Sequence, residues 1–162
     1  MTMKKTRQGR KPLVGIVYGS VSDESVMKEC SAVLAAFDVP FEMAVMSAHR
    51  QPGRVAAYAS SAAGRGLKVI VAGAGLAAHL AGAVAAHSTL PVIGVPLDAG
   101  SLGGLDALLA TVQMPQGVPV ATVAIGKHGA KNAAWLALQI LALADSRLAA
   151  QLRTHKESLA TS

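Results

Sequence analysis

From Leu13 onward, short runs of apolar residues alternate with segments in which apolar residues recur every three or four positions. The runs are almost continuously apolar, as expected of strands that are buried on both faces of a sheet. The periodic segments between them predict amphipathic helices. The predicted strands are Leu13–Tyr18, Phe41–Met46, Lys68–Ala72, Pro91–Val95 and Val118–Ala124.

Helices are predicted between these strands and after the last one. Pro52 suits the first turn of a helix, and Gly64 and Gly66 are typical of the end of the same helix. The predicted helices cover about residues 23–37, 52–63, 77–86, 105–112, 130–144 and 145–156. Repeated strand–helix units predict a three-layer α/β/α sandwich with a five-stranded parallel sheet in the flavodoxin-like order.

The charge of the chain is concentrated near its N-terminus. The formal net charge is +6, but five basic residues stand in the first eleven positions without an acid, and the rest of the chain has ten Lys and Arg against nine Asp and Glu. We therefore expect residues 1–12 to be a disordered basic tail and 13–162 to form a single catalytic domain, with C-terminal helices at about 130–156. A near-neutral domain does not predict a nucleic-acid partner; a polyanion-binding arm in the tail is the alternative.

The composition indicates the kind of core and argues against membrane, secreted, disulfide-rich and metal-binding proteins. Hydrophobic residues make up 52% of the chain but aromatic residues only 3%, which predicts a core of small aliphatic side chains. Polar residues, Gly and Pro interrupt every apolar run before it reaches bilayer length, and no signal-peptide pattern follows the basic start. Cys30 alone forms no disulfide framework, and the histidines lack the spacing of a metal site. We expect a cytoplasmic protein without metal or membrane contact.

Glycines and residues with hydroxyl or titratable side chains follow the five predicted strands. In open α/β sheets, ligands bind beyond the carboxyl ends of the strands, so a site is expected in these segments. The segments are Gly19–Asp23, Ser47–Arg50, Gly73–Gly75 with His79 just beyond, Leu97–Ser101 and Gly126–Gly129. Their glycines, hydroxyl groups and titratable side chains predict one site at a single edge of the sheet.

The segment Gly19–Asp23 has the features of an anion site. Gly19 allows a sharp turn, and Ser20 and Ser22 precede a helix whose free N–H groups favour a phosphate monoester. The Gly-Lys-Ser/Thr ending of a Walker loop is absent from this segment, so a nucleoside triphosphate is not indicated. The alternative is that Ser22 only caps the helix.

His49 and Arg50 supply an acid–base group and a cation. Arginine completes a phosphate clamp through paired hydrogen bonds, and histidine exchanges a proton near neutral pH. The alternative for His49 and Arg50 is a solvated or structural role in a loop. His79, on an otherwise apolar helix, has a structural role as its alternative to a role in the site. Three roles are open for Lys127: it contacts an anion, forms a Schiff base with a substrate, or is solvated.

Six sequence motifs occur in order between residues 13 and 144. They are Gly-Ser-x-Ser-Asp from Gly19, Ser-Ala-His-Arg from Ser47, Ala-Gly-Ala-Gly-x-Ala-Ala-His-Leu from Ala72, Pro-Val-Ile-Gly-Val-Pro from Pro91, Val-Gln-Met-Pro-x-Gly-Val-Pro-Val from Val112 and Ala-Ile-Gly-Lys from Ala124. Through these motifs the chain resembles the class I N5-carboxyaminoimidazole ribonucleotide mutases (PurE) of purine biosynthesis.

The resemblance implies an isomerase that interconverts N5-carboxyaminoimidazole ribonucleotide (N5-CAIR) and 4-carboxyaminoimidazole ribonucleotide (CAIR). It implies no metal, ATP or other cofactor, and a homo-octamer with active sites at subunit interfaces. Arg50 stands where the animal-type enzymes that use carbon dioxide have lysine, which favours the mutase.

The resemblance also implies roles for individual residues. The general acid and base is His49. The other positions bind the ribonucleotide: its phosphate at Ser20, Ser22 and Arg50, its ribose at Asp23, and its base with the migrating carboxylate at Ser47, Gly75 and His79.

Departures from the family pattern lie beside the predicted carboxylate pocket. Leu76 and Ala81 stand where the family usually has Gly and Pro, and Asp98 and Gly100 change the loop after the fourth strand. If the family glycine has a positive φ, Leu76 must strain or remodel its loop. The alternatives to the mutase are therefore a carboxylase that uses carbon dioxide directly, a paralogue acting on another ribonucleotide, and a non-catalytic nucleotide-binding protein.

Overall fold

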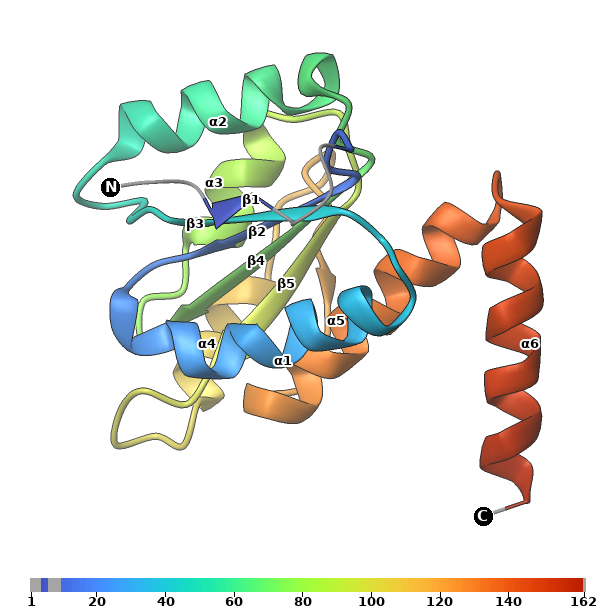
Figure 1. The fold of residues 1–162 in the computed structure, drawn as a ribbon. Helices are drawn as coiled ribbons and strands as arrows, with labels where there is room; N and C mark the ends of the chain where they lie inside the picture. The colour runs from blue at the N-terminus through green and yellow to red at the C-terminus, as the bar shows by residue number, and fades with distance from the viewer. Residues whose placement is uncertain (1–3, 6–9, 162) are drawn as a thin grey trace.

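A sheet with helices on both faces forms the centre of the computed structural model, which describes residues 4–5 and 10–161 (Figure 1). Its parallel strands are β2 (Val14–Tyr18), β3 (Phe41–Val45), β4 (Val69–Gly75), β5 (Val92–Leu97) and β6 (Ala121–Thr122). Their order across the sheet is β3-β2-β4-β5-β6. The predicted five parallel strands and their flavodoxin-like order are confirmed.

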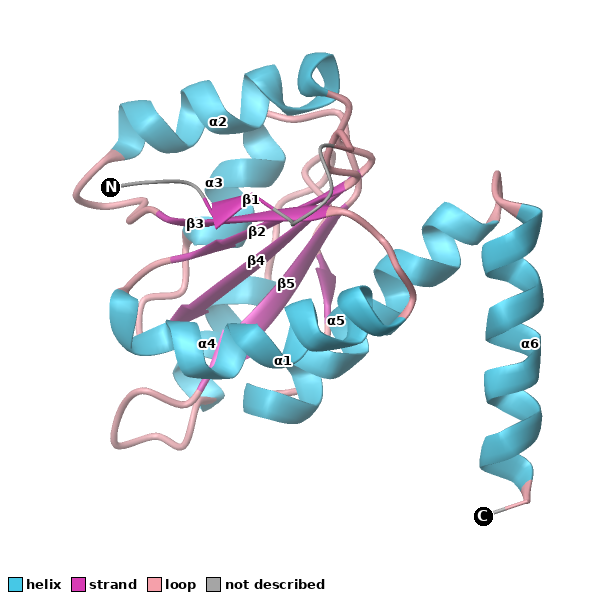
Figure 2. Cartoon of the chain, in the orientation of Figure 1, coloured by secondary structure: helices cyan, strands magenta, loops and turns pink. Residues whose placement is uncertain are grey.

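The helices lie in two layers (Figure 2). One face of the sheet is covered by α1 (Glu24–Ala36) and α5 (Gly126–Ala142), and the other by α2 (Pro52–Arg65) and α3 (Leu80–Ala86). The short helix α4 (Leu105–Val112) packs against β5, and α6 (Ser146–Ala160) packs against α5. The predicted three-layer sandwich is therefore present.

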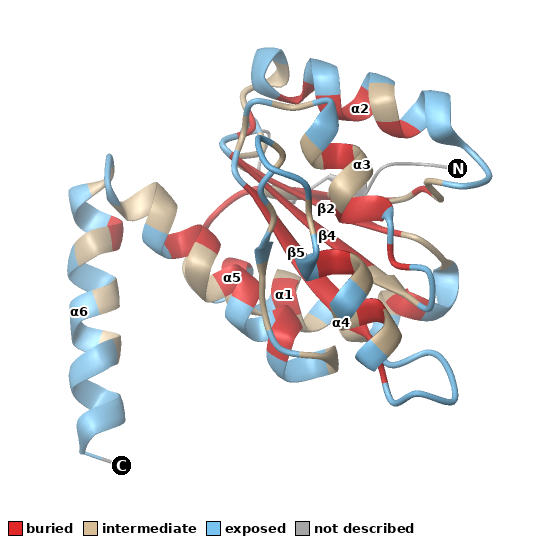
Figure 3. Ribbon diagram, turned by 180° about the vertical axis from the view of Figure 1, so that it is seen from behind, coloured by how far each residue is buried: buried red, intermediate tan, exposed pale blue. Residues whose placement is uncertain are grey.

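Two apolar clusters, one on each face of the sheet, hold the layers together. Figure 3 shows that the central strands are mostly buried and that the helices around them are partly exposed. Side chains of one strand alternate between the two clusters: Ile16 packs toward α1 and α5, and Val17 packs toward α2 and α3. Fully buried alanines on α5 allow this helix to lie close to α1. Within the part of the chain that the structure describes, no helix is long and apolar enough to cross a membrane.

A two-residue strand, β1 (Lys4–Lys5), pairs antiparallel with β3 at the edge of the sheet. These residues were expected in a disordered tail, because two lysines carry no strand signal of their own. The pairing depends on the free edge that β3 offers, which is a property of the folded sheet. The predicted tail at 1–3 and 6–9 lies outside the described residues.

Two predicted boundaries around the third strand need correction. β4 continues to Gly75, and α3 begins at Leu80 instead of Ala77. Leu76 has a φ of 52°, and the carbonyl groups of Leu76 and Ala77 accept hydrogen bonds at 2.8 Å from the residues two positions ahead. These bonds close tight turns, and the first bond of helical spacing runs from the N–H of Ala83 to the carbonyl of His79 at 2.9 Å, so the helix begins only after His79.

The last strand and helix also differ from the prediction. β6 has only two residues instead of the seven from Val118 to Ala124, in a segment where Pro119 lacks the N–H that a sheet requires. α5 begins at Gly126, four residues earlier than expected. Gly129 makes this start possible, because a side chain there would collide with the carbonyl oxygen of Ala124.

Candidate active site

A cavity of about 300 Å³ lies where β2, β3 and β4 end. Because parallel strands end at the same edge of the sheet, segments far apart in the sequence meet there. Six of the eight predicted site residues line the cavity: Ser20, Ser22, Asp23, Ser47, His49 and Gly75. Arg50 and His79 do not line it but are hydrogen-bonded to residues that do. The structure thus brings the predicted residues together, and their chemical roles stay predictions.

The segment after β2 forms one side of the cavity through a capping box on the 3-10 helix η1 (Val21–Asp23). The N–H of Ser20 donates to the Asp23 carboxylate at 3.0 Å, and the Ser22 hydroxyl donates to the Ser20 hydroxyl at 3.0 Å. The capping residue is Ser20 and not Ser22. Hydroxyl groups and the start of α1 are therefore held at the cavity in a fixed arrangement.

Asp23 is the buried acid of this segment. Burial raises the pKa of its carboxyl group, and the hydrogen bonds from the Ser20 N–H and the Ser22 hydroxyl act in the opposite direction. The carboxyl group keeps acceptor capacity beyond these two bonds, because a carboxylate has two oxygens with several lone pairs.

Arg50 lies beside the same segment. The loop after β3 turns back at Ser47, whose hydroxyl accepts the N–H of Arg50 at 3.3 Å. The Arg50 guanidinium then donates to the carbonyl of Gly19 at 3.4 Å. An exposed guanidinium bonded to the segment that carries the Ser20 and Ser22 hydroxyls is suited to a phosphate group.

His49 and His79 form a hydrogen-bonded pair. Nε2 of His49 lies 2.8 Å from Nδ1 of His79, and the two rings are nearly perpendicular, at 80°. His79 is the residue before the first turn of α3, and its side chain makes no capping bond. The two histidines are 30 positions apart, and nothing in the sequence indicates this contact.

Part of the cavity lining is apolar and comes from the end of β4, the start of α3 and the segments that follow β4 and β5. It is formed by Ala74, Leu76, Ala77, Leu80 and Ala99. Leu76 has a positive φ, whereas Ala81 is buried on α3 and does not line the cavity. Ala99 was not among the predicted site residues, although it lies in the segment Leu97–Ser101 after a strand, where a site was expected.

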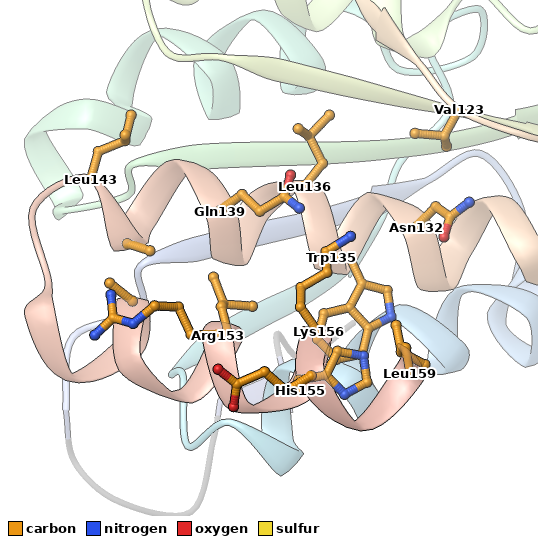
Figure 4. A pocket seen from close by; sticks show the side chains of 14 residues that line it. Val123, Asn132, Trp135, Leu136, Gln139, Leu143, Arg153, His155, Lys156 and Leu159 are labelled. Atoms are coloured by element: carbon orange, nitrogen blue, oxygen red, sulfur yellow. The ribbon is translucent and has the colours of Figure 1, made fainter. Parts of the chain in front are cut away.

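A second, larger groove of about 1020 Å³ runs between α5 and α6 (Figure 4). Its lining is mostly apolar, with the Trp135 and His155 rings stacked at 4.0 Å, and it contains none of the predicted site residues. Lys127 is exposed on the first turn of α5 and lines neither cavity, as its solvated interpretation predicts.

Metal binding has no candidate cluster among the described residues: no three His, Cys, Asp or Glu side chains converge there. The absence of a metal from the reaction stays a prediction.

Comparisons with known proteins identify the family of the chain. The family model "AIR carboxylase" matches residues 13–162. An N5-carboxyaminoimidazole ribonucleotide mutase of Mycobacterium tuberculosis is 54% identical over 155 residues, which are 96% of this chain and 88% of the relative. A phosphoribosylaminoimidazole carboxylase of Saccharomyces cerevisiae is 58% identical over 136 residues, 84% of this chain and 24% of that longer protein.

A solved structure with the same fold is the crystal structure of Treponema denticola PurE. It has a TM-score of 0.82 and 29% sequence identity, and the match covers 93% of this chain and 92% of that one. Because the family model and the relatives extend over nearly the whole chain, the chain belongs to the AIR carboxylase family.

Proposed function

We propose that the chain interconverts N5-CAIR and CAIR; its relative from Mycobacterium tuberculosis is named an N5-carboxyaminoimidazole ribonucleotide mutase. The observation that carries the proposal is that His49, which is hydrogen-bonded to His79, lines the same cavity as Ser20, Ser22 and Asp23. A ribonucleotide with a carboxylated base needs these groups: polar contacts for its phosphate and ribose, and an acid–base group at its base.

The phosphate and ribose are held at the Ser20 side. The Ser20 and Ser22 hydroxyls and the Arg50 guanidinium donate to phosphate oxygens, and charge-assisted hydrogen bonds of this kind are the strong ones. The Asp23 carboxylate accepts from the ribose hydroxyls. Ser47 and Gly75 contact the base and its carboxylate beside His49.

The chemistry at the base requires two proton transfers. His49 gives a proton to N5 as the N5–carboxylate bond breaks, which releases neutral carbon dioxide and leaves the aminoimidazole ribonucleotide. C4 then attacks this carbon dioxide, and His49 takes back a proton from C4. His79 orients the His49 ring throughout. Protons and bonding electrons balance without any change of oxidation state, so the scheme includes no cofactor.

The active form in this proposal is a homo-octamer in the cytoplasm. Support for assembly comes from apolar side chains that no other part of the described chain covers, such as Leu143, which is 89% exposed, and Leu159 on α6. Sedimentation at micromolar concentration should give eight copies, and a stable monomer with full activity would reject the octamer. The proposal includes no nucleic-acid or membrane partner.

The proposal is tested by ultraviolet assays with each imidazole ribonucleotide. We expect conversion of N5-CAIR to CAIR without added bicarbonate. The alternative named in the Saccharomyces cerevisiae relative is a carboxylase. Turnover of aminoimidazole ribonucleotide with bicarbonate, but not of N5-CAIR, would favour this carboxylase. Ribonucleotide binding with no turnover of any substrate would identify a non-catalytic binding protein.

A further inference from the structure

Three aromatic rings join α6 to the body of the protein. The Trp135 indole on α5 and the His155 imidazole on α6 are stacked, with centroids 4.0 Å apart and an angle of 11° between the ring planes (Figure 4). Phe37, the residue after α1, meets the Trp135 ring edge-on at 5.1 Å, an arrangement that aromatic pairs favour. The helices α1, α5 and α6 therefore meet at this cluster.

Helix α6 depends on the stack for the attachment of its second half. At the start of the helix, the Asp145 carboxylate accepts the N–H of Leu148 at 3.0 Å, and Leu148 is fully buried. Leu152, one turn later, is half-buried, and residues 156–161 are all exposed. His155 is thus the last residue of α6 that is even partly buried, so its ring determines whether the second half of the helix stays docked.

The stack contains a group that changes its charge near neutral pH. Of the three rings, the imidazole is the one that gains and loses a proton between about pH 5 and pH 8. A cation within about 6 Å of the centroid of an indole face is attracted by the ring, and the His155 ring lies within this distance. A protonated His155 therefore holds α6 on Trp135 more strongly than a neutral His155, whose ring only stacks.

Among the described residues, the charges near the stack supply no stronger partner for a protonated His155. They are Arg153, Lys156 and Glu157 on α6, Lys131 on α5 with its ion-pair partner Glu29 on α1, and Asp38 after α1 with its partner Arg10. On a helix, side chains three or four positions apart face each other, and those at these distances from His155 are uncharged. The Trp135 face is consequently the group that distinguishes a charged imidazole from a neutral one.

We propose that the Trp135–His155 stack is a pH-sensitive latch for α6. Protonation of His155 docks the second half of the helix on α5, and loss of the proton as pH rises loosens it. When the helix loosens, Trp135 and Leu136, which line the groove between α5 and α6, become more accessible. None of the described residues lines both this groove and the cavity at the ends of the strands, so the latch does not depend on the proposed reaction.

The experiment measures amide hydrogen exchange of residues 152–160 in the full chain at about pH 5.5 and about pH 7.5. Each rate is corrected for the chemical exchange rate at that pH. Exchange requires opening of α6, so protection should be about three- to fivefold higher at the lower pH, the scale of an exposed cation–π contact. Trp135 is the sole tryptophan of the chain, so its fluorescence reports on the same stack and should fall when the touching imidazole is protonated.

Two variants separate the proton from the packing. His155→Phe keeps a ring on Trp135 but carries no proton, and Trp135→Leu keeps an apolar side chain but lacks the ring face. In both variants, protection should be the same at the two pH values. His128→Gln, at an exposed histidine on the first turn of α5 that does not line the groove, is the matched control and should keep the wild-type pH dependence. Circular dichroism checks that each variant is folded.

Equal protection of α6 at the two pH values in the wild type would overturn the latch, and so would a pH dependence that persists in His155→Phe. A fluorescence change without a change in protection would mean that the stack titrates but does not hold α6, which also overturns the proposal. These results are independent of the conversion of N5-CAIR, which the ultraviolet assays measure separately.

Discussion

Nε2 of His49 and Nδ1 of His79 are 2.8 Å apart, so one ring must donate to the other. The bond places one proton between these two nitrogens, and it leaves the second nitrogen of each ring for exchange with substrate or solvent. Two fully protonated rings would direct N–H against N–H across this distance. The hydrogen bond between the rings therefore requires that one of these two nitrogens accepts.

Replacement of the two histidines should have unequal effects. His49→Asn removes the group that transfers protons, and we expect kcat to fall by about 10²- to 10⁴-fold. His79→Asn removes only the orienting partner, and we expect a smaller fall, of about tenfold, with KM unchanged. Steady-state kinetics with N5-CAIR gives both values. His87→Asn, at an exposed histidine outside the cavity, is the control and should behave as the wild type.

Arg50→Ala should weaken substrate binding. A hydrogen bond to a charged group contributes about 1.5–3 kcal/mol, which corresponds to a KM about 10- to 100-fold higher. Chemistry at the base is distant from this contact, so kcat should change little. Arg54→Ala removes the same charge four residues further along, where the guanidinium contacts Gln51, and should leave KM unchanged. Equal KM changes in both variants would indicate a general charge effect instead of a phosphate contact.

The pH dependence of stability should reveal the buried Asp23. Burial raises the pKa of Asp23 above its ordinary value of 3.8, so the folded state binds this proton more tightly than the unfolded state. The stabilisation is complete below the ordinary value and is lost as pH rises through the higher folded value. Relative to Asp23→Asn, the free energy of unfolding of the wild type should therefore fall as pH rises from about 4 toward 7.

Urea unfolding of both proteins at several pH values in this range measures the difference. If the stability of the wild type relative to Asp23→Asn stays constant or increases as pH rises, ionisation of Asp23 does not destabilise the folded protein.

Arg65→Met should destabilise the fold without touching the cavity. Arg65 donates to Glu42 at 2.9 Å, and the Glu42 side chain is only 2% exposed. Without its cation, this carboxylate stays buried and unpaired, at a cost of about 3 kcal/mol, the lower end for a broken buried pair because Arg65 is partly exposed. Lys28→Met breaks the exposed pair with Glu24 and should cost less than about 0.5 kcal/mol. Chemical denaturation compares the two variants.

The pattern of apolar positions predicted the architecture because that architecture is repetitive. Each buried strand requires a continuous apolar run and each covering helix an apolar stripe, so the order of elements is visible along the chain. The early start of α5 was not predicted because Gly126 and Gly129 are typical of a loop, while here Gly129 allows close packing on Ala124. This packing contact can be seen only in the folded structure.

The candidate site was predicted in outline for a similar reason. A parallel sheet brings all its carboxyl ends to one edge, so residues after different strands were expected together. The contact between His49 and His79 could not be predicted in this way, since nothing in their sequence separation relates them. It follows from how the loop after β3 packs against the start of α3.

The most direct test of the proposed reaction is a label-transfer measurement. N5-CAIR carrying ¹³C in its N5-carboxylate is converted by the chain in unlabelled bicarbonate, and the ¹³C content of the CAIR is determined by mass spectrometry. If carbon dioxide is released, held beside His49 and captured by C4 of the same molecule, the product keeps the label. CAIR without label, formed from solvent bicarbonate, would contradict this mechanism.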